Sequence, residues 1–114
     1  MITDLKYLQQ MTGNDGAMMS EMIELFLSQL AEMKEDIQVL MDNRNWPELS
    51  RMAHKIKSSA LVMGVAPMSD DMKELELLAK EGKNTEKYPD YIARFHSMSD
   101  SVQLELRTYL DSAK

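Results

Sequence analysis

Apolar residues recur at intervals of three and four along nearly the whole chain, and this spacing is the strongest constraint on its fold. A period near 3.6 residues places those side chains on one face of an α-helix, whereas a half-buried strand needs alternation at every second residue. With Gly 4 and Pro 3 in 114 residues, the chain also lacks the frequent turns of an all-β domain. The pattern therefore predicts an all-α fold.

Breaks in the apolar spacing divide the chain into one short helix and four long ones. The predicted helices cover residues 3–11, 15–42, 46–63, 67–81 and 86–112. Thr3 or Asp4 is the expected N-cap of the first helix, and Asn45 with Glu48 has the spacing of a capping box at the third. Gly64 is suited to the left-handed turn that ends many helices.

Short connections require neighbouring helices to run antiparallel. We therefore expect a single domain over residues 1–114, an up-down-up-down four-helix bundle with a short additional N-terminal helix. The helix at 15–42 should carry a core stripe made of Ile23, Phe26, Leu30, Met33, Ile37 and Leu40. Most of the 12 methionines are expected to fill the core.

Composition and charge argue against several classes of function. A net charge of −6 opposes binding to nucleic-acid phosphates. Cys 0 removes thiolate chemistry, and the absence of a glycine-rich phosphate loop argues against nucleotide binding. The chain has neither a signal-peptide pattern nor an apolar run near the ~20 residues that span a bilayer. We expect a cytoplasmic protein, free-standing or cut from a larger one.

His54 is predicted to lie on the solvent side of the third helix. At ~100° per residue, apolar positions such as Ala53 and Ile56 fall within one arc, and His54 lies about 140° from its centre. An exposed imidazole is largely neutral and nucleophilic at pH 7. Lys57, at i+3, is close enough to offset the negative charge of a phosphoryl group on that ring.

A surface histidine followed by lysine is usually just a solvated helix face, but three neighbouring features favour a functional role here. Ser58 and Ser59 are small enough for a partner to approach closely, and Leu61 places an apolar side chain on the same exposed stripe. Residues 44–57 hold four cations and one anion, a basic island that would attract an acidic pocket: Arg44, Arg51, Lys55 and Lys57 against Glu48.

His96 is the internal comparison. Its neighbours at i+3 and i+4 are Ser99 and Asp100, so no cation is placed to steady a phosphate there. We interpret His96 as an ordinary structural residue. Neither histidine has a second ligand at metal-binding spacing, which argues against a metal-binding bundle.

The segment Ala53-His54-Lys55-Ile56-Lys57-Ser58-Ser59-Ala60, followed by Gly64 and then by Leu75-Glu76, resembles the motif of histidine-containing phosphotransfer (Hpt) domains. The stretch Ile23-Glu24-Leu25-Phe26-Leu27 is also similar to the family's second helix. The resemblance extends from Leu5 to Leu110. One position differs, because Ser58 stands where the family often has Gly; its hydroxymethyl group narrows the approach to His54 or offers a phosphate a hydrogen bond.

The resemblance implies a phosphocarrier of a two-component phosphorelay, without autokinase activity. His54 would be the phosphoacceptor and Lys57 would stabilise the phosphate. The partners would be receiver domains of response regulators or hybrid sensor kinases. The receiver would supply the carboxylates and Mg²⁺, so no intrinsic cofactor is expected. The family default is a monomer.

Helical geometry also places candidate docking residues around His54. The candidates are Ser50, Arg51, Lys55, Ser58, Leu61 and Met22, with Met18 and Met19 as further exposed apolar groups. The alternative function is a non-catalytic helical adaptor that binds a partner through a Met-rich surface. A degenerate, inactive Hpt-like domain is disfavoured because both His54 and Lys57 are present.

Overall fold

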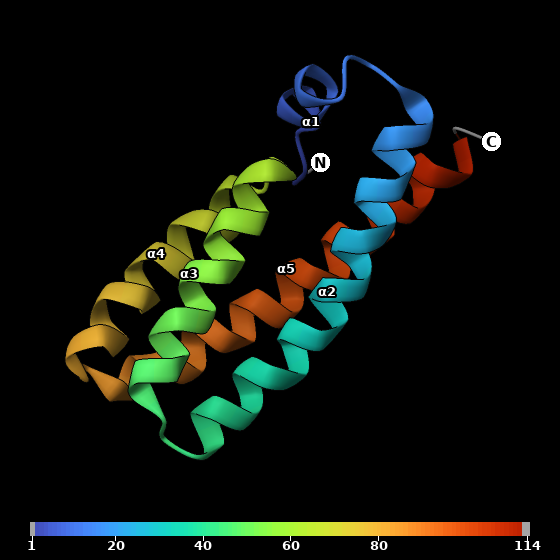
Figure 1. Cartoon of the computed structure of the whole chain (residues 1–114). Coiled ribbons are helices and arrows are strands. Elements are labelled where there is room, and N and C mark those ends of the chain that lie inside the picture. Colours follow the sequence, from blue (N-terminus) through green and yellow to red (C-terminus); the bar gives the residue numbers. More distant parts are fainter. Residues whose placement is uncertain (1, 113–114) are drawn as a thin grey trace.

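The structure, a computed structural model, describes residues 2–112 and is built from helices and short connections (Figure 1). The elements are α1 (Lys6–Met11), α2 (Gly16–Asp42), α3 (Trp46–Val62), α4 (Ala66–Glu81), the 3₁₀ turn η1 (Thr85–Lys87) and α5 (Tyr88–Ser112). The described residues include no strand, and the predicted all-α class is confirmed. None of the described helices combines the length and apolar character that crossing a bilayer requires.

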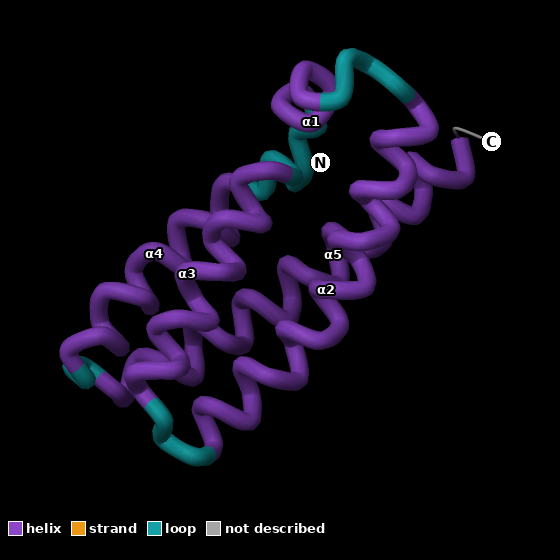
Figure 2. Tube along the Cα trace, in the orientation of Figure 1, coloured by secondary structure: helices purple, strands orange, loops and turns teal. Residues whose placement is uncertain are grey.

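The four long helices form a closed ring of neighbours. Helix α2 contacts α3 and α5, and α4 contacts the same two helices. The chain reverses direction at each connection, so consecutive long helices run antiparallel (Figure 1; Figure 2). The shorter helices α3 and α4 make the most extensive contact of any pair. They therefore present a common outer face, and α1 lies across one end of that pair (Figure 1).

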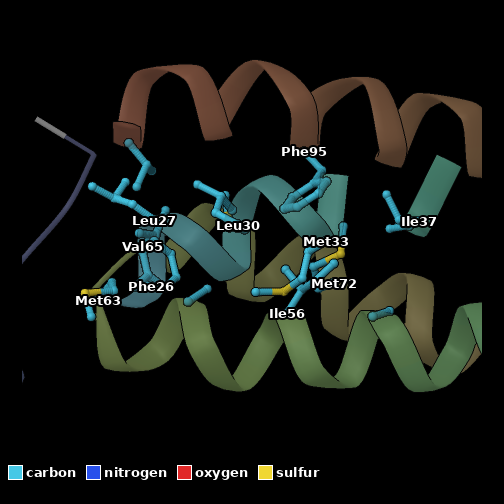
Figure 3. Packing of buried hydrophobic residues seen from close by; sticks show 14 of the residues in the cluster. Phe26, Leu27, Leu30, Met33, Ile37, Ile56, Met63, Val65, Met72 and Phe95 are labelled. Atoms are coloured by element: carbon cyan, nitrogen blue, oxygen red, sulfur yellow. The ribbon is translucent and has the colours of Figure 1, made fainter. Parts of the chain in front are cut away.

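The core lies between the long helices and receives the apolar faces that the spacing predicts. Met33 of α2, Ile56 of α3 and Met72 of α4 point into the same interior (Figure 3). All three are at most 1% exposed. Burying a side chain of this size stabilises a fold by roughly 1.5–3 kcal/mol, so this interior holds α3 and α4 in a fixed register.

Two helix starts differ in how they are capped. Asp15 caps α2, because its carboxylate accepts a hydrogen bond from the Met18 amide at 3.1 Å. The capping box predicted for α3 is wrong: the Asn45 side chain makes no cap hydrogen bond, and the Glu48 carboxylate pairs with Arg51 instead. Since that carboxylate is turned toward Arg51, it does not reach back to the helix start.

The first helix begins at Lys6, not at residue 3 as predicted. The preceding residues 2–5 are not helical and are held in place by partners far away in the sequence. The Glu105 carboxylate of α5 accepts hydrogen bonds from the amides of Ile2 and Thr3 and from the Thr3 hydroxyl, the last at 2.8 Å. The Asp4 amide donates to the Gly64 carbonyl at 3.0 Å. We call Ile2, Thr3 and Glu105 the N-terminal clasp.

The clasp should make the free energy of unfolding depend on pH in the acidic range. Burial raises the pKa of Glu105, but the hydrogen bonds from Ile2 and Thr3 outweigh it and leave the pKa below its ordinary value of 4.5. The unfolded state therefore binds more protons in this range, so the stabilisation is present above about pH 4.5 and is lost as the pH falls. Glu105→Gln should be less stable at pH 7 and should lose less stability between pH 5 and pH 3 than the wild type.

Urea denaturation at several pH values measures this effect. Glu32→Gln, on the exposed side of α2, removes the same charge without touching the clasp and serves as the control. Identical acid dependence in Glu105→Gln and the wild type would contradict the assignment.

Candidate functional site

His54 lies on the outer face of α3, as its helical phase predicts. Its chain neighbour Ala53 and the following Ile56 are buried in the core, while 59% of the His54 side chain is exposed. The buried neighbours fix the helix against α2 and α4, so the imidazole is presented to solvent from a rigid element. An incoming group can therefore reach the ring without any opening of the bundle.

Glu76 of α4 connects His54 with Lys57. One carboxylate oxygen lies 2.9 Å from His54 Nδ1, and the other accepts a hydrogen bond from Lys57 Nζ at 3.1 Å. The three side chains form a line of imidazole, carboxylate and ammonium across the α3–α4 seam. Lys57 is therefore connected to His54 through the Glu76 carboxylate. In the sequence, only the Leu75-Glu76 pair of the family motif pointed to this residue.

The contact with Glu76 determines which ring nitrogen is available for chemistry. Burial raises the pKa of Glu76, but hydrogen bonds from Lys57 and His54 outweigh this effect and leave the pKa below its ordinary value. The group is therefore a carboxylate at neutral pH and can only accept hydrogen bonds. His54 Nδ1 must carry the hydrogen, so the neutral ring has its lone pair on Nε2, directed away from Glu76.

A family model described as the Hpt domain matches residues 21–113. The chain belongs to the Hpt domain family. The match covers α3, α4 and α5 in full and α2 from residue 21 onward, and it includes His54, Lys57 and Glu76. No curated protein and no solved structure matches the chain. Hpt domains act in phosphotransfer within two-component phosphorelays and generally interact with receiver domains, which is the family-level function of this chain.

In this Hpt domain, Ser50 of α3 helps to position Glu76 through a hydrogen bond to its backbone. Its side chain is buried, and its hydroxyl donates to the backbone carbonyl of Glu76 at 2.8 Å. The bond ties α3 to α4 at the level of Glu76 and so helps to hold that carboxylate opposite His54. Ser50 was predicted as a docking residue, but its hydroxyl is occupied by this contact.

The other predicted docking residues of α3 lie around the Hpt histidine. Ser58 is exposed, and its hydroxyl donates to the His54 carbonyl at 3.2 Å within the same helix. Leu61 is 59% exposed, one further turn along. Lys55 is exposed beside His54, and Arg51 is exposed one turn before it.

The candidates from α2 separate into three environments. Met22 is half-buried and lines a groove between α2 and α3 together with Leu25, Ser59 and Val62. Met18 is exposed. The expectation that Met19 is exposed is wrong, because it is 3% exposed and accepts a hydrogen bond from the Tyr109 hydroxyl at its sulfur. Helix α5 covers that position, which the period of α2 alone could not indicate.

The basic island is weaker than a count along the sequence suggests. Lys57 is paired with Glu76, Arg51 with Glu48, and the Arg44 guanidinium lies over the Trp46 ring. The count of charges over residues 44–57 did not include Glu76, because Glu76 belongs to the next helix, α4.

His96 is half-buried, with its ring beside Phe95 at a centroid distance of 5.8 Å.

Proposed function

We propose that His54 accepts a phosphoryl group from the phosphoaspartate of a receiver domain and passes it to a second receiver. The observation that carries the proposal is the imidazole that is 59% exposed and whose Nδ1 faces Glu76 at 2.9 Å, which leaves Nε2 on the side of the ring away from that carboxylate. A nucleophile for this reaction needs a free lone pair on a positioned atom, and Nε2 has both.

The reaction exchanges one bond to phosphorus for another. The Nε2 lone pair attacks phosphorus in line, an N–P bond forms, and the bond between phosphorus and the aspartyl oxygen breaks. The electron pair of that bond leaves with the aspartate carboxylate. Nδ1 keeps its proton, so the ring gains positive charge, which the Glu76 carboxylate at 2.9 Å stabilises.

Lys57 has a charge-balancing role in this proposal. A bare carboxylate beside the acceptor nitrogen would repel an incoming phosphoryl group. The ammonium of Lys57 donates a hydrogen bond to one carboxylate oxygen of Glu76 at 3.1 Å and so offsets its negative charge, while the other oxygen stays in contact with His54 Nδ1. We expect the receiver to provide the carboxylates and Mg²⁺ that act on the phosphoryl group, and no resident cofactor in this chain.

The test of this function is transfer of labelled phosphate. A receiver domain charged with ³²P from acetyl phosphate is mixed with the chain, and the label is followed onto the smaller protein. The proposal expects acid-labile, base-stable label on the peptide that contains His54. Label that resists acid, or that maps to another peptide, would contradict the proposal.

We further propose that the receiver docks over the exposed side of α3 and the adjoining part of α2. Leu61 is exposed two turns after His54 on the same face of α3, and Met22 lines a largely apolar groove between α2 and α3. Leu61→Asp would place a charge in that contact, and we expect transfer from the receiver to slow by about tenfold, a typical loss for one central interface residue. Helix content by circular dichroism should not change.

Leu104→Asp is the matched control, because Leu104 is 70% exposed on α5 and undergoes the same change outside the docking surface. Transfer rates in Leu104→Asp should equal those of the wild type. Equal rates in both variants and the wild type would remove Leu61 from the interface.

A further inference from the structure

A cleft beside His54 has no role in the chemistry described so far. It opens on the N-terminal side of His54 along α3, away from Lys57, between the first turns of α3 and the last turns of α4. Its lining residues are Pro47, Ser50, Arg51, His54, Glu76 and Lys80. The cleft therefore joins the phosphoacceptor to two cations that the sequence motif does not include as phosphate ligands.

The charges in the cleft are unequally satisfied. Glu76 is balanced by Lys57, and Arg51 is paired with Glu48. Among the described residues, Lys80 is the cation lining the cleft with no ion-pair partner. It follows Glu76 by four residues on α4, so the two side chains share one helix face. His54 and Lys80 both line this cleft, so a phosphoryl group carried on the His54 ring would place its negative charge beside the cleft.

We propose that Lys80 binds the phosphoryl group carried on His54, so that the cleft is an oxyanion site and Lys80 sets how the phosphoryl group is shared between this domain and its receiver. The inference rests on the proposed function of His54. A phosphoryl group carries up to two negative charges and three acceptor oxygens, and an ammonium is its simplest ligand. Because Lys57 is already engaged with Glu76, Lys80 can meet the added charge without breaking an existing pair.

Lys80 also stands in the last turn of α4, where a cation interacts favourably with the helix dipole. That role alone would affect thermal stability and leave the phosphorylated state untouched. The experiment therefore has to measure a property of the phosphoryl group itself.

The first measurement uses phosphoramidate, a small donor that phosphorylates histidine without a receiver. The phosphoryl resonance of phospho-His54 is followed by ³¹P NMR as a function of pH. Removal of a nearby cation disfavours the dianion, so its titration should move to higher pH in Lys80→Ala and should return toward the wild-type position in Lys80→Arg. Lys73→Ala is the matched control, because Lys73 is an exposed lysine of the same helix that does not line the cleft.

The second measurement is the equilibrium of phosphoryl groups between the receiver and this domain. Lys80→Ala should lower the equilibrium constant for phospho-His54 formation by about two- to fivefold, in keeping with one exposed ion pair, and high salt should reduce the difference. If Lys80→Ala matches Lys73→Ala in both measurements, the inference is overturned.

The two measurements also separate this inference from the proposed function. Phosphoramidate labelling of His54 without any transfer from receivers would refute the relay function, while the ³¹P titration would still decide the role of Lys80. Transfer that proceeds normally with no effect of Lys80→Ala would refute the role of Lys80 alone.

Discussion

Replacing His54 by Gln is expected to reduce phosphoryl acceptance from a charged receiver to background. The glutamine amide nitrogen has no available lone pair, so it cannot attack phosphorus. It can still donate a hydrogen bond to the Glu76 carboxylate, which keeps that residue and Lys57 in place. Because the His54 side chain is 59% exposed, the substitution should change the free energy of unfolding by no more than about 0.5 kcal/mol. Loss of label therefore reports on chemistry and not on folding.

His96→Gln is the control for this experiment, since it removes the other histidine of the chain. It should accept label at the wild-type rate. Acid-labile label that persists in His54→Gln and disappears in His96→Gln would reverse the assignment of the phosphoacceptor.

Helical periodicity was sufficient to predict the features that depend on local sequence. The face on which His54 lies follows from the phase of its own helix, and the structure has it exposed with Ala53 and Ile56 buried. The spacing predicted a helix over 46–63, and α3 spans Trp46–Val62. Such features are determined by the sequence within a few helical turns of the residue concerned.

Features that depend on distant segments could not be predicted in this way. The start of α1 is set by Glu105, which is 102 residues from Thr3, and no local propensity contains that contact. The link from His54 through Glu76 to Lys57 depends on how α3 and α4 are aligned, which is decided by the packing of their buried faces. A count of charges along 44–57 therefore overestimated the basic island, and Lys80 could not be placed beside His54 at all.

Replacing Gly64 by Ala should cause the largest loss of stability of any single methyl addition to this chain's glycines. Gly64 ends the α3–α4 turn with φ +68°, a left-handed conformation that costs an alanine roughly 1–2 kcal/mol. A Cβ at this position would also lie 1.8 Å from the Asp4 carbonyl oxygen. The segment before α1 must then move away and give up the hydrogen bond from the Asp4 amide to the Gly64 carbonyl. Together these effects should lower the free energy of unfolding by about 2–4 kcal/mol, as measured by urea denaturation.

Gly13→Ala separates the two contributions, because Gly13 has nearly the same backbone conformation, φ +62°, and open space around its missing Cβ. It should lose only the conformational part, roughly 1–2 kcal/mol. The difference between the variants measures how firmly the segment before α1 is held against the α3–α4 turn. Equal losses at the two positions would mean that this segment moves aside freely, and the contact between Asp4 and Gly64 would then contribute little to the fold.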